Sequence, residues 1–337
     1  MAATDSSVLL RSTPSGLYCE AGDFHIDPWR SVGRALVTHA HSDHARPGSG
    51  AYLAAAEGEA ILRHRLGQGA DITALPFGEK RTIGGVTVSF HPAGHIRGSA
   101  QLRVERDGEV WVVTGDYKRE ADPTCTPFEV VPCHTLITEA TFAFPIYRWE
   151  PTPVVIGDIV SWLDGCRAVG RTAILYSYTL GKAQRLLAEL APYIEGPVWV
   201  HGAVEPINEI YRRDGVALGV TRRVSELAAR ERLQGELVIA PPSAATPGWM
   251  RHFTEPDTAF ASGWMRLRGT RRRRSLDRGF AISDHADWNG LLRTVEESGA
   301  SRVLATHGDS AALVRFLAER GLEASALDTP FAREEEE

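Results

Sequence analysis

The feature that most constrains this chain is a cluster of metal-ligand residue types: His39, His41, Asp43 and His44. It directly follows the apolar run Ala35-Leu36-Val37, which predicts a buried strand ending in a polar loop. Neutral imidazole is a good nitrogen ligand for zinc, and a carboxylate adds a charge-neutralising oxygen. With this spacing, alternate side chains can face one metal ion while the Asp-His pair turns to a second. The motif predicts a metal centre; a chance cluster or a structural polar turn is the alternative.

Composition places the chain among globular proteins. Its 337 residues are enough for one large domain or two ordinary ones, and 43% are hydrophobic and 24% charged. No apolar run approaches the roughly 18 residues of a membrane span. The N-terminus lacks a basic segment followed by an apolar one, so we expect no secretory signal. Four scattered cysteines without a CxxC pair predict reduced thiols in a cytoplasmic enzyme.

Charge is unevenly distributed along the sequence. The net charge of −6 argues weakly against a nucleic-acid partner, but the acidic tail Glu334–Glu337 supplies −4 of it. Residues 262–280 carry one acid and seven arginines: Arg266, Arg268, Arg271, Arg272, Arg273, Arg274 and Arg278. The local field can therefore be strongly positive whatever the net charge.

Several predicted strands end in a ligand-type residue. Apolar runs at 24–26, 86–90, 109–113, 136–137 and 303–305 lead to these residues, in order: Asp27, His95, Asp116, Glu139 and His307. The segment 281–284 resumes the pattern before His285. We also expect helices at 54–66 and 310–320. Glycines beside these strand ends allow the backbone to approach closely, so the pattern predicts one site at the edge of a sheet.

The segment 144–153, with three prolines and three aromatic residues, predicts a domain boundary. Beyond it the sequence predicts an α/β pattern. It consists of a helix at 153–168, a strand at 173–176, a helix from Lys182, and strands at 198–200 and 237–240. We therefore expect domain segments at 1–150, 151–280 and 281–337, of which the middle one is an inserted α/β domain.

The ligand-type residues are enough for two metal ions. One would be held by His39, His41 and His95, the second by Asp43, His44 and His307, with Asp116 bridging them. Two metal ions about 3.5–4 Å apart are suited to phosphodiester hydrolysis. Nitrogen and oxygen ligands of this kind favour Zn²⁺, with Mn²⁺ as a substitute.

As a set, these motifs resemble the metallo-β-lactamase superfamily. The matches, in order, are Asp27, HAHSDH at 39–44, His95 in AGHIRGSA and Asp116 in TGD. Three further matches resemble its β-CASP nuclease branch: Glu139 in TEAT, His285 in SDHAD and His307 in THGD. The sequence is most similar to bacterial exonucleases associated with DNA ligases, through SGWM at 262–265, the arginine run and GFAISDHADW at 279–288.

The resemblance implies an αββα sandwich with an inserted α/β β-CASP cap domain. It also implies catalytic roles for Asp43, His285 and Glu139, with His285 as general acid and Glu139 holding its imidazole. For His285, a metal ligand is the alternative. Asp27 would orient the metal ligands from behind without touching a metal ion, and a strand-end turn is the alternative. The implied partners are a DNA ligase that uses ATP and a helicase.

Candidate nucleic-acid contacts follow from charge and position. Arg271, Arg272, Arg273 and Arg274 precede His285 and would bind phosphates, or form a solvated loop. Ser177 and Lys182 lie between a strand and a helix, where backbone N–H groups can meet a phosphate; a helix cap is the alternative. Trp249, Trp264 and Trp288 would stack on bases or pack in the core.

The sequence therefore predicts a two-metal phosphodiesterase, specifically a DNA exonuclease of repair. An RNA endonuclease or exonuclease of the same branch is the first alternative, since only the treatment of the 2′-hydroxyl differs. A small-molecule metallo-hydrolase is a further alternative, but such an enzyme would lack the inserted domain and the residues Glu139, His285 and His307. An inactive nucleic-acid-binding scaffold is the last alternative, but it would lack metal ligands.

Overall fold

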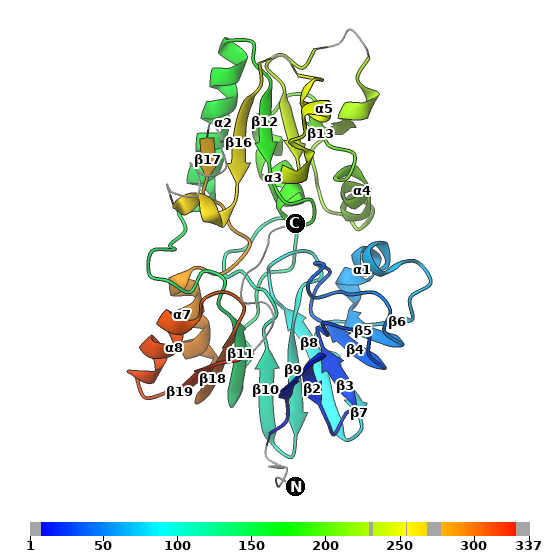
Figure 1. The fold of residues 1–337 in the computed structure, drawn as a ribbon, viewed down its shortest axis with the longest axis vertical. Helices are drawn as coiled ribbons and strands as arrows, with labels where there is room; N and C mark the ends of the chain where they lie inside the picture. Colours follow the sequence, from blue (N-terminus) through cyan, green and yellow to red (C-terminus); the bar gives the residue numbers. More distant parts are fainter. Residues whose placement is uncertain (1–7, 229–231, 254, 268–277, 328–337) are drawn as a thin grey trace. The chain divides into compact units, whose positions relative to one another are not determined.

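The computed structural model describes residues 8–228, 232–253, 255–267 and 278–327. The chain forms two compact units (Figure 1). Of the described residues, the first unit contains 8–121, 125–146 and 285–327. The second contains 122–124 and the described residues between 147 and 284. Within the described residues, no helix is long and apolar enough to cross a membrane.

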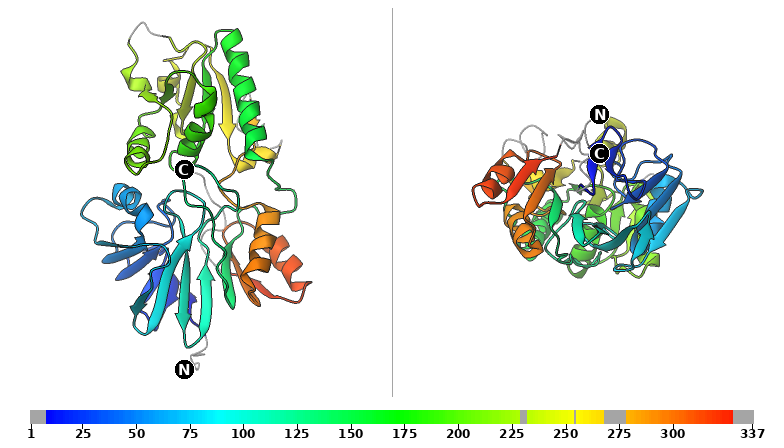
Figure 2. Two further views of the ribbon diagram at one scale, coloured as in Figure 1. Left: turned by 180° about the vertical axis from the view of Figure 1, so that it is seen from behind. Right: turned by 90° about the horizontal axis from the view of Figure 1, so that it is seen from below.

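Two facing sheets build the first unit (Figure 2). One has the strand order β1 to β6: β1 (Arg11–Thr13), β2 (Gly16–Cys19), β3 (Phe24–Ile26), β4 (Arg34–Val37), β5 (Ala51–Ala55) and β6 (Ile72–Leu75). The strands from β3 to β6 are parallel. The 3₁₀ helix η1 (Ala56–Gly58) and helix α1 (Glu59–Leu66) follow β5.

The second sheet of this unit runs in the order β19-β18-β11-β10-β9-β8-β7. Its strands are β7 (Arg81–Ile83), β8 (Val86–Pro92), β9 (Ala100–Arg106), β10 (Glu109–Val113), β11 (Thr135–Glu139), β18 (Arg302–Thr306) and β19 (Glu323–Ala326). Leu36 and Leu53 of the first sheet share one core with Val88, Leu102 and Ile137 of the second. The outer face packs on helices α7 (Trp288–Ser298) and α8 (Ala311–Ala318).

The second unit is a six-stranded parallel sheet with the order β14-β13-β15-β12-β16-β17. Its strands are β12 (Ala173–Tyr176), β13 (Val198–Val200), β14 (Thr221–Arg223), β15 (Leu237–Ala240), β16 (Asp257–Ala261) and β17 (Arg278–Phe280). Its helices are α2 (Thr152–Ala168), α3 (Lys182–Leu190), α4 (Glu205–Arg213) and α5 (Pro247–Met250). Short 3₁₀ turns are η2 (Ala191–Tyr193), η3 (Val224–Glu226), η4 (Pro242–Ala244) and η5 (Gly263–Arg266). Ile159 and Leu163 of α2 and Leu187 of α3 lie in one core with Leu175 and Ile239 of the sheet.

The expected fold class is confirmed: a two-sheet α/β sandwich is accompanied by a separate α/β unit. The exact domain boundaries at 150 and 280 stay a prediction.

Two local expectations are wrong. The helix expected from residue 54 begins at Glu59, because Ala54 pairs with Val37 on one side and Ala74 on the other. Pairing on both edges outweighs the helix propensity of alanine. No strand leads directly into His285, since β17 ends at Phe280.

Candidate metal centre

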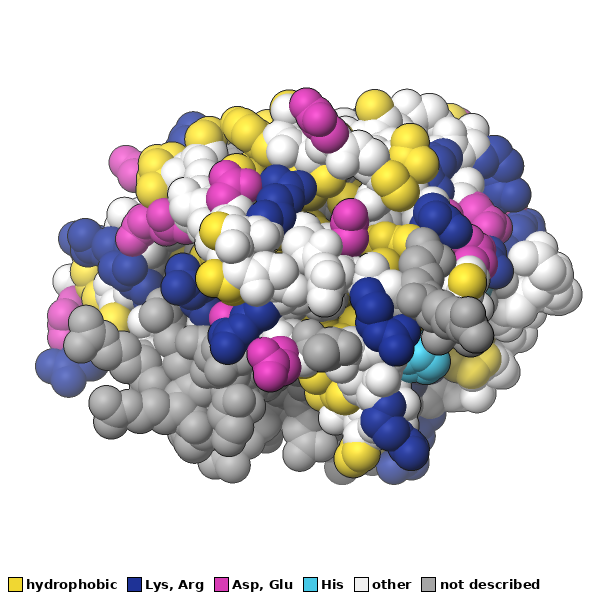
Figure 3. Space-filling model, turned by 90° about the horizontal axis from the view of Figure 1, so that it is seen from above, with side chains coloured by type: hydrophobic (Ala, Val, Ile, Leu, Met, Phe, Trp, Pro, Cys, Tyr) yellow, Lys and Arg dark blue, Asp and Glu magenta, His cyan; other side chains and the backbone are white. Residues whose placement is uncertain are grey.

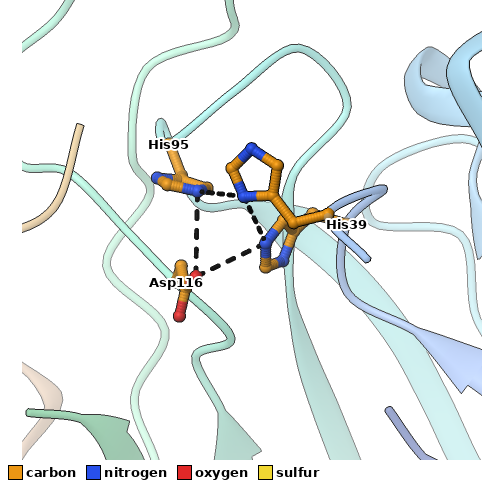
Figure 4. A group of neighbouring side chains, drawn as sticks. His39, His95 and Asp116 are labelled. Atoms are coloured by element: carbon orange, nitrogen blue, oxygen red, sulfur yellow. Dashed lines mark hydrogen bonds and ion pairs between the residues drawn. The ribbon is translucent and has the colours of Figure 1, made fainter. Parts of the chain in front are cut away.

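The first group of metal-ligand atoms lies at strand ends of the first unit and comprises His39, His41, His95 and Asp116. Figure 4 shows the side chains of His39, His95 and Asp116 pointing toward one another. His39 follows β4, His95 follows β8 and Asp116 follows β10. His41 Nδ1 lies 3.1 Å from both His39 Nε2 and His95 Nε2. Asp116 Oδ2 lies 3.4 Å from His39 Nε2 and 3.8 Å from His95 Nε2. One ligand atom from each residue therefore faces a common point.

These spacings fit a metal ion. Zinc–nitrogen bonds of about 2.0–2.1 Å in a tetrahedron place ligand atoms roughly 3.3 Å apart. His41 Nδ1 has one proton or one lone pair, so it cannot form a good hydrogen bond to both neighbouring nitrogens. Asp116 Oδ1 is buried and has no hydrogen-bond partner among the described residues. A cation would satisfy these atoms, as buried polar groups require.

A second group contains Asp43, His44 and His307. His44 Nε2 lies 3.3 Å from Asp43 Oδ2 and 3.5 Å from Asp116 Oδ2. The His44 and His307 rings stack with their centroids 5.0 Å apart. Asp116 Oδ2 thus lies close to nitrogens of both groups, which is the position expected of a bridging carboxylate. The structure brings all seven predicted metal ligands together, while their role as ligands stays a prediction.

Burial and neighbouring charges set the protonation of this cluster. Burial, followed by the nearby histidines, lowers the pKa of His95 well below its usual value. Burial and His44 lower the pKa of His307 to about 4. Both imidazoles are therefore neutral at pH 7, the form that binds metal. Burial opposes ionisation of Asp116, yet the charge of His44 and hydrogen bonds from His39 and His44 outweigh it and hold its pKa well below the ordinary range.

Asp43 and His44 form an adjacent pair beside Asp116. Burial opposes the ionisation of Asp43, but the adjacent His44 charge and hydrogen bond lower its pKa. For His44, burial also favours the neutral form, and the carboxylates of Asp43, Asp116 and Asp27 outweigh it and raise the pKa. The cluster concentrates negative charge, so it attracts cations, whether a proton or a metal ion.

Asp27 supports the metal-ligand loop from behind. Its Oδ1 accepts the Thr38 backbone N–H at 2.8 Å and its Oδ2 accepts the Thr38 hydroxyl at 2.6 Å. Its Oδ2 also accepts from His44 Nδ1 at 2.7 Å, so His44 presents Nε2 to the centre. Asp27 has a positive φ of 42°, a strained backbone for a non-glycine residue. Thr38 therefore anchors Asp27 behind the metal-ligand loop. In the sequence, only its position directly before the first histidine marks it for this role.

Glu139 and His285 form a pair at the edge of the centre. Glu139, which is buried, accepts from His285 Nδ1 at 2.8 Å through Oε2 and from the Tyr117 N–H at 2.6 Å through Oε1. The centroid of the His285 ring lies 4.6 Å from that of His95 and 5.9 Å from that of Phe142, and the His285 and Phe142 planes meet at 68°. Asp116, Glu139 and His285 also offer three ligand-type atoms within 4.8 Å of one another. The metal-ligand alternative for His285 therefore stays open.

The residues predicted to contact nucleic acid lie apart from the metal-ligand groups in the sequence, and two of them are buried. Ser177 is fully buried. Lys182 is 4% exposed, and its Nζ contacts the Ile282 carbonyl at 3.2 Å and Asp284 Oδ2 at 3.1 Å. A phosphate contact by Lys182 would therefore require its ammonium group to leave these partners. Arg271, Arg272, Arg273 and Arg274 lie outside the described residues.

Two further expectations concern the charged surface and the tryptophan side chains. On the face seen from above, the described Lys and Arg side chains stand among acidic and apolar ones (Figure 3). Trp288 is buried in the core of the first unit, and Trp249 and Trp264 pack partly buried against the core of the second. The structure thus shows core packing for Trp288, while base stacking by Trp249 and Trp264 stays a prediction.

Comparison with known proteins gives several relatives. A protein named "Probable DNA ligase" from Opitutus terrae is 35% identical over 319 residues, which are 93% of this chain and 30% of that protein. The endoribonuclease YSH1 of Gibberella zeae is 33% identical over 127 residues, 36% of this chain and 15% of that protein. An RNase J-like protein of Methanocaldococcus jannaschii is 25% identical over 150 residues, 42% of this chain and 36% of that protein. The chain thus spans about a third or less of each relative.

No protein-family model matches the chain. Among solved structures, a protein of unknown function from Enterococcus faecalis has a TM-score of 0.53 at 13% identity, covering 81% of this chain and 74% of its own. At this identity the likeness concerns the fold alone.

Proposed function

Because the chain belongs to the metallo-β-lactamase-fold β-CASP family, we propose that it is a metal-dependent DNA exonuclease that hydrolyses phosphodiester bonds in DNA repair. The observation that carries the proposal is the convergence of two groups of metal-ligand atoms on Asp116, with the Glu139–His285 pair beside them. An acid–base pair next to a cation site is what hydrolysis of an anionic ester requires.

His39, His41 and His95 would hold one metal ion, Asp43, His44 and His307 the second, and Asp116 both. When bound, two divalent ions, Zn²⁺ or Mn²⁺, supply Lewis-acid chemistry and neutralise the charge that develops on the phosphate. Asp27 fixes the His44 ring so that Nε2 faces the centre.

His285 would serve as general acid. Its Nδ1 donates to Glu139 Oε2 at 2.8 Å, and the Tyr117 N–H holds the other carboxylate oxygen. This pairing fixes the ring orientation. In the imidazolium form, Nε2 would donate its proton to the leaving oxygen as the oxygen of water bonds to phosphorus and the P–O bond to the leaving group breaks.

The choice of DNA is supported by the relative named for a DNA ligase, whose similarity extends over 93% of this chain. The same similarity supports a functional association with a DNA ligase; the use of ATP by that ligase and a helicase partner rest on the resemblance alone. RNA is the second candidate, because the similarity to the Gibberella zeae endoribonuclease extends over 36% of this chain. A small-molecule hydrolase or an inactive scaffold has less support, since neither requires the Glu139–His285 pair.

The deciding experiment compares single-stranded DNA labelled at either end with RNA of the same sequence, in Zn²⁺ or Mn²⁺. We expect release of mononucleotides from one end of the DNA and slower cleavage of RNA. Asp43→Ala should abolish cleavage and thereby exclude a contaminating nuclease. Intact DNA beside cleaved RNA would establish the RNA alternative. If two metal ions bind and neither polymer is cut, the nuclease proposal is wrong.

A further inference from the structure

The loop that carries His95, residues 93–99 between β8 and β9, is closed by its own hydrogen bonds. Ser99 Oγ accepts the backbone N–H groups of His95 at 3.0 Å and Ile96 at 3.2 Å. The Ala93 N–H donates to the Ser99 carbonyl, and the Ser99 N–H to the Ile96 carbonyl, both at 3.0 Å. Ser99 is 2% exposed, so water does not compete for its hydroxyl. The backbone at His95 is thereby held in one conformation.

A second set of contacts braces this loop from η1. Arg97 Nη1 lies 2.9 Å from Glu57 Oε1, and the Thr126 hydroxyl donates to Glu57 Oε2 at 2.9 Å. The Arg97 and Glu57 side chains are 16% and 17% exposed, so the pair is largely shielded from solvent. Gly98 has a φ of +74°, and a Cβ at this position would overlap the backbone of Gly58. Glu57 therefore ties the loop to η1, beside the close approach of Gly98 to Gly58.

A ligand that is already oriented loses little conformational freedom when the metal ion arrives. Its supporting hydrogen bonds then act on metal affinity, although they do not touch the ion. We propose that Ser99 and Glu57 are positioning residues for His95, which hold its imidazole at the metal centre before a metal ion binds. The proposal rests on the metal centre proposed above.

Ser99→Ala tests the hydrogen bonds within the loop. We expect its dissociation constant for Zn²⁺, measured by competition with a chromophoric chelator, to rise by about 10–100-fold. Ser89→Ala is the matched control. Ser89 is also buried in the first unit, and its Oγ lies 3.0 Å from Nε2 of His91, which is in none of the metal-ligand groups found among the described residues. This control should bind Zn²⁺ like the unmodified chain.

Glu57→Gln tests the bracing contact and serves as a second variant should Ser99→Ala fold poorly. The amide retains one acceptor for either Arg97 or Thr126 and loses the charge, so we expect a several-fold rise in the Zn²⁺ dissociation constant. Glu59→Gln is its control, because Glu59 pairs with Arg63 at 2.8 Å within α1. Thermal unfolding of each variant verifies that the fold is intact.

His95→Ala distinguishes an error in the proposed metal centre from an error in the positioning role of Ser99 and Glu57. It should reduce the number of Zn²⁺ ions bound per chain, measured by elemental analysis. If it does not, the proposed centre is wrong. If His95→Ala loses Zn²⁺ while Ser99→Ala and Glu57→Gln bind it as tightly as their two controls, the centre stands and the positioning role is overturned.

Discussion

At the scale of single residues, the Glu139–His285 pair gives the most specific prediction about mechanism. Glu139→Gln presents one oxygen to two donors, so either the Tyr117 N–H or His285 Nδ1–H faces an amide NH₂ group. We expect kcat for DNA cleavage to fall by about 10²–10⁴, the range typical of general acid catalysis, with bound Zn²⁺ unchanged. Activity on a p-nitrophenyl phosphodiester, whose leaving group needs no proton, should fall much less.

The chain offers a matched control for this substitution. Glu129 pairs with His91 Nδ1 at 3.2 Å, so Glu129→Gln removes a similar carboxylate–imidazole contact away from the centre. Its kinetics should equal those of the unmodified chain. Equal losses on both substrates in Glu139→Gln would show that Glu139 acts on something other than leaving-group protonation.

At the scale of elements, ion pairs between buried side chains hold the first turn of α3. Lys182 and Arg185 both contact Asp284, and all three side chains are nearly inaccessible to solvent. Lys182→Met removes one partner and leaves Arg185 in place. We expect a loss of roughly 1.5–3 kcal/mol in the free energy of unfolding, measured in urea, as for hydrogen bonds to charged groups. Lys182→Met combined with Asp284→Asn should cost less than the sum of the losses in the two single variants, because the two residues are coupled.

The same variant tests the earlier expectation that Lys182 binds nucleic acid. If its ammonium group contacts phosphate, Lys182→Met weakens DNA binding and reduces the salt dependence by about one charge. Its stability would then be unchanged. Loss of stability with an unchanged salt dependence identifies Lys182 as a structural residue of the second unit.

These cases separate what local sequence can predict from what it cannot. The placement of His39 and Asp116 at strand ends was predictable because each follows an apolar strand, whereas the pairing of β4 and β10 into two different sheets was not. The environment of Lys182 was not, because its acceptor at Ile282 lies 100 residues away. Ala54 shows the same limit for secondary structure: pairing with both β4 and β6 decided its conformation. The Glu139–His285 contact, 146 residues apart, was expected only through family resemblance.

At the scale of the whole molecule, all proposed metal ligands belong to the first unit, so metal removal should act on that unit selectively. At a free Zn²⁺ concentration 100 times the dissociation constant, each bound ion stabilises the folded form by about 2.7 kcal/mol. Chelation should therefore speed hydrogen exchange through unfolding of this unit by roughly 100-fold for each ion removed. Amides of β8, β9 and β11 should respond, while those of α2 and α3 should not. Equal acceleration in α2 and α3 would mean that the two units unfold together, and no acceleration in either would contradict the metal centre.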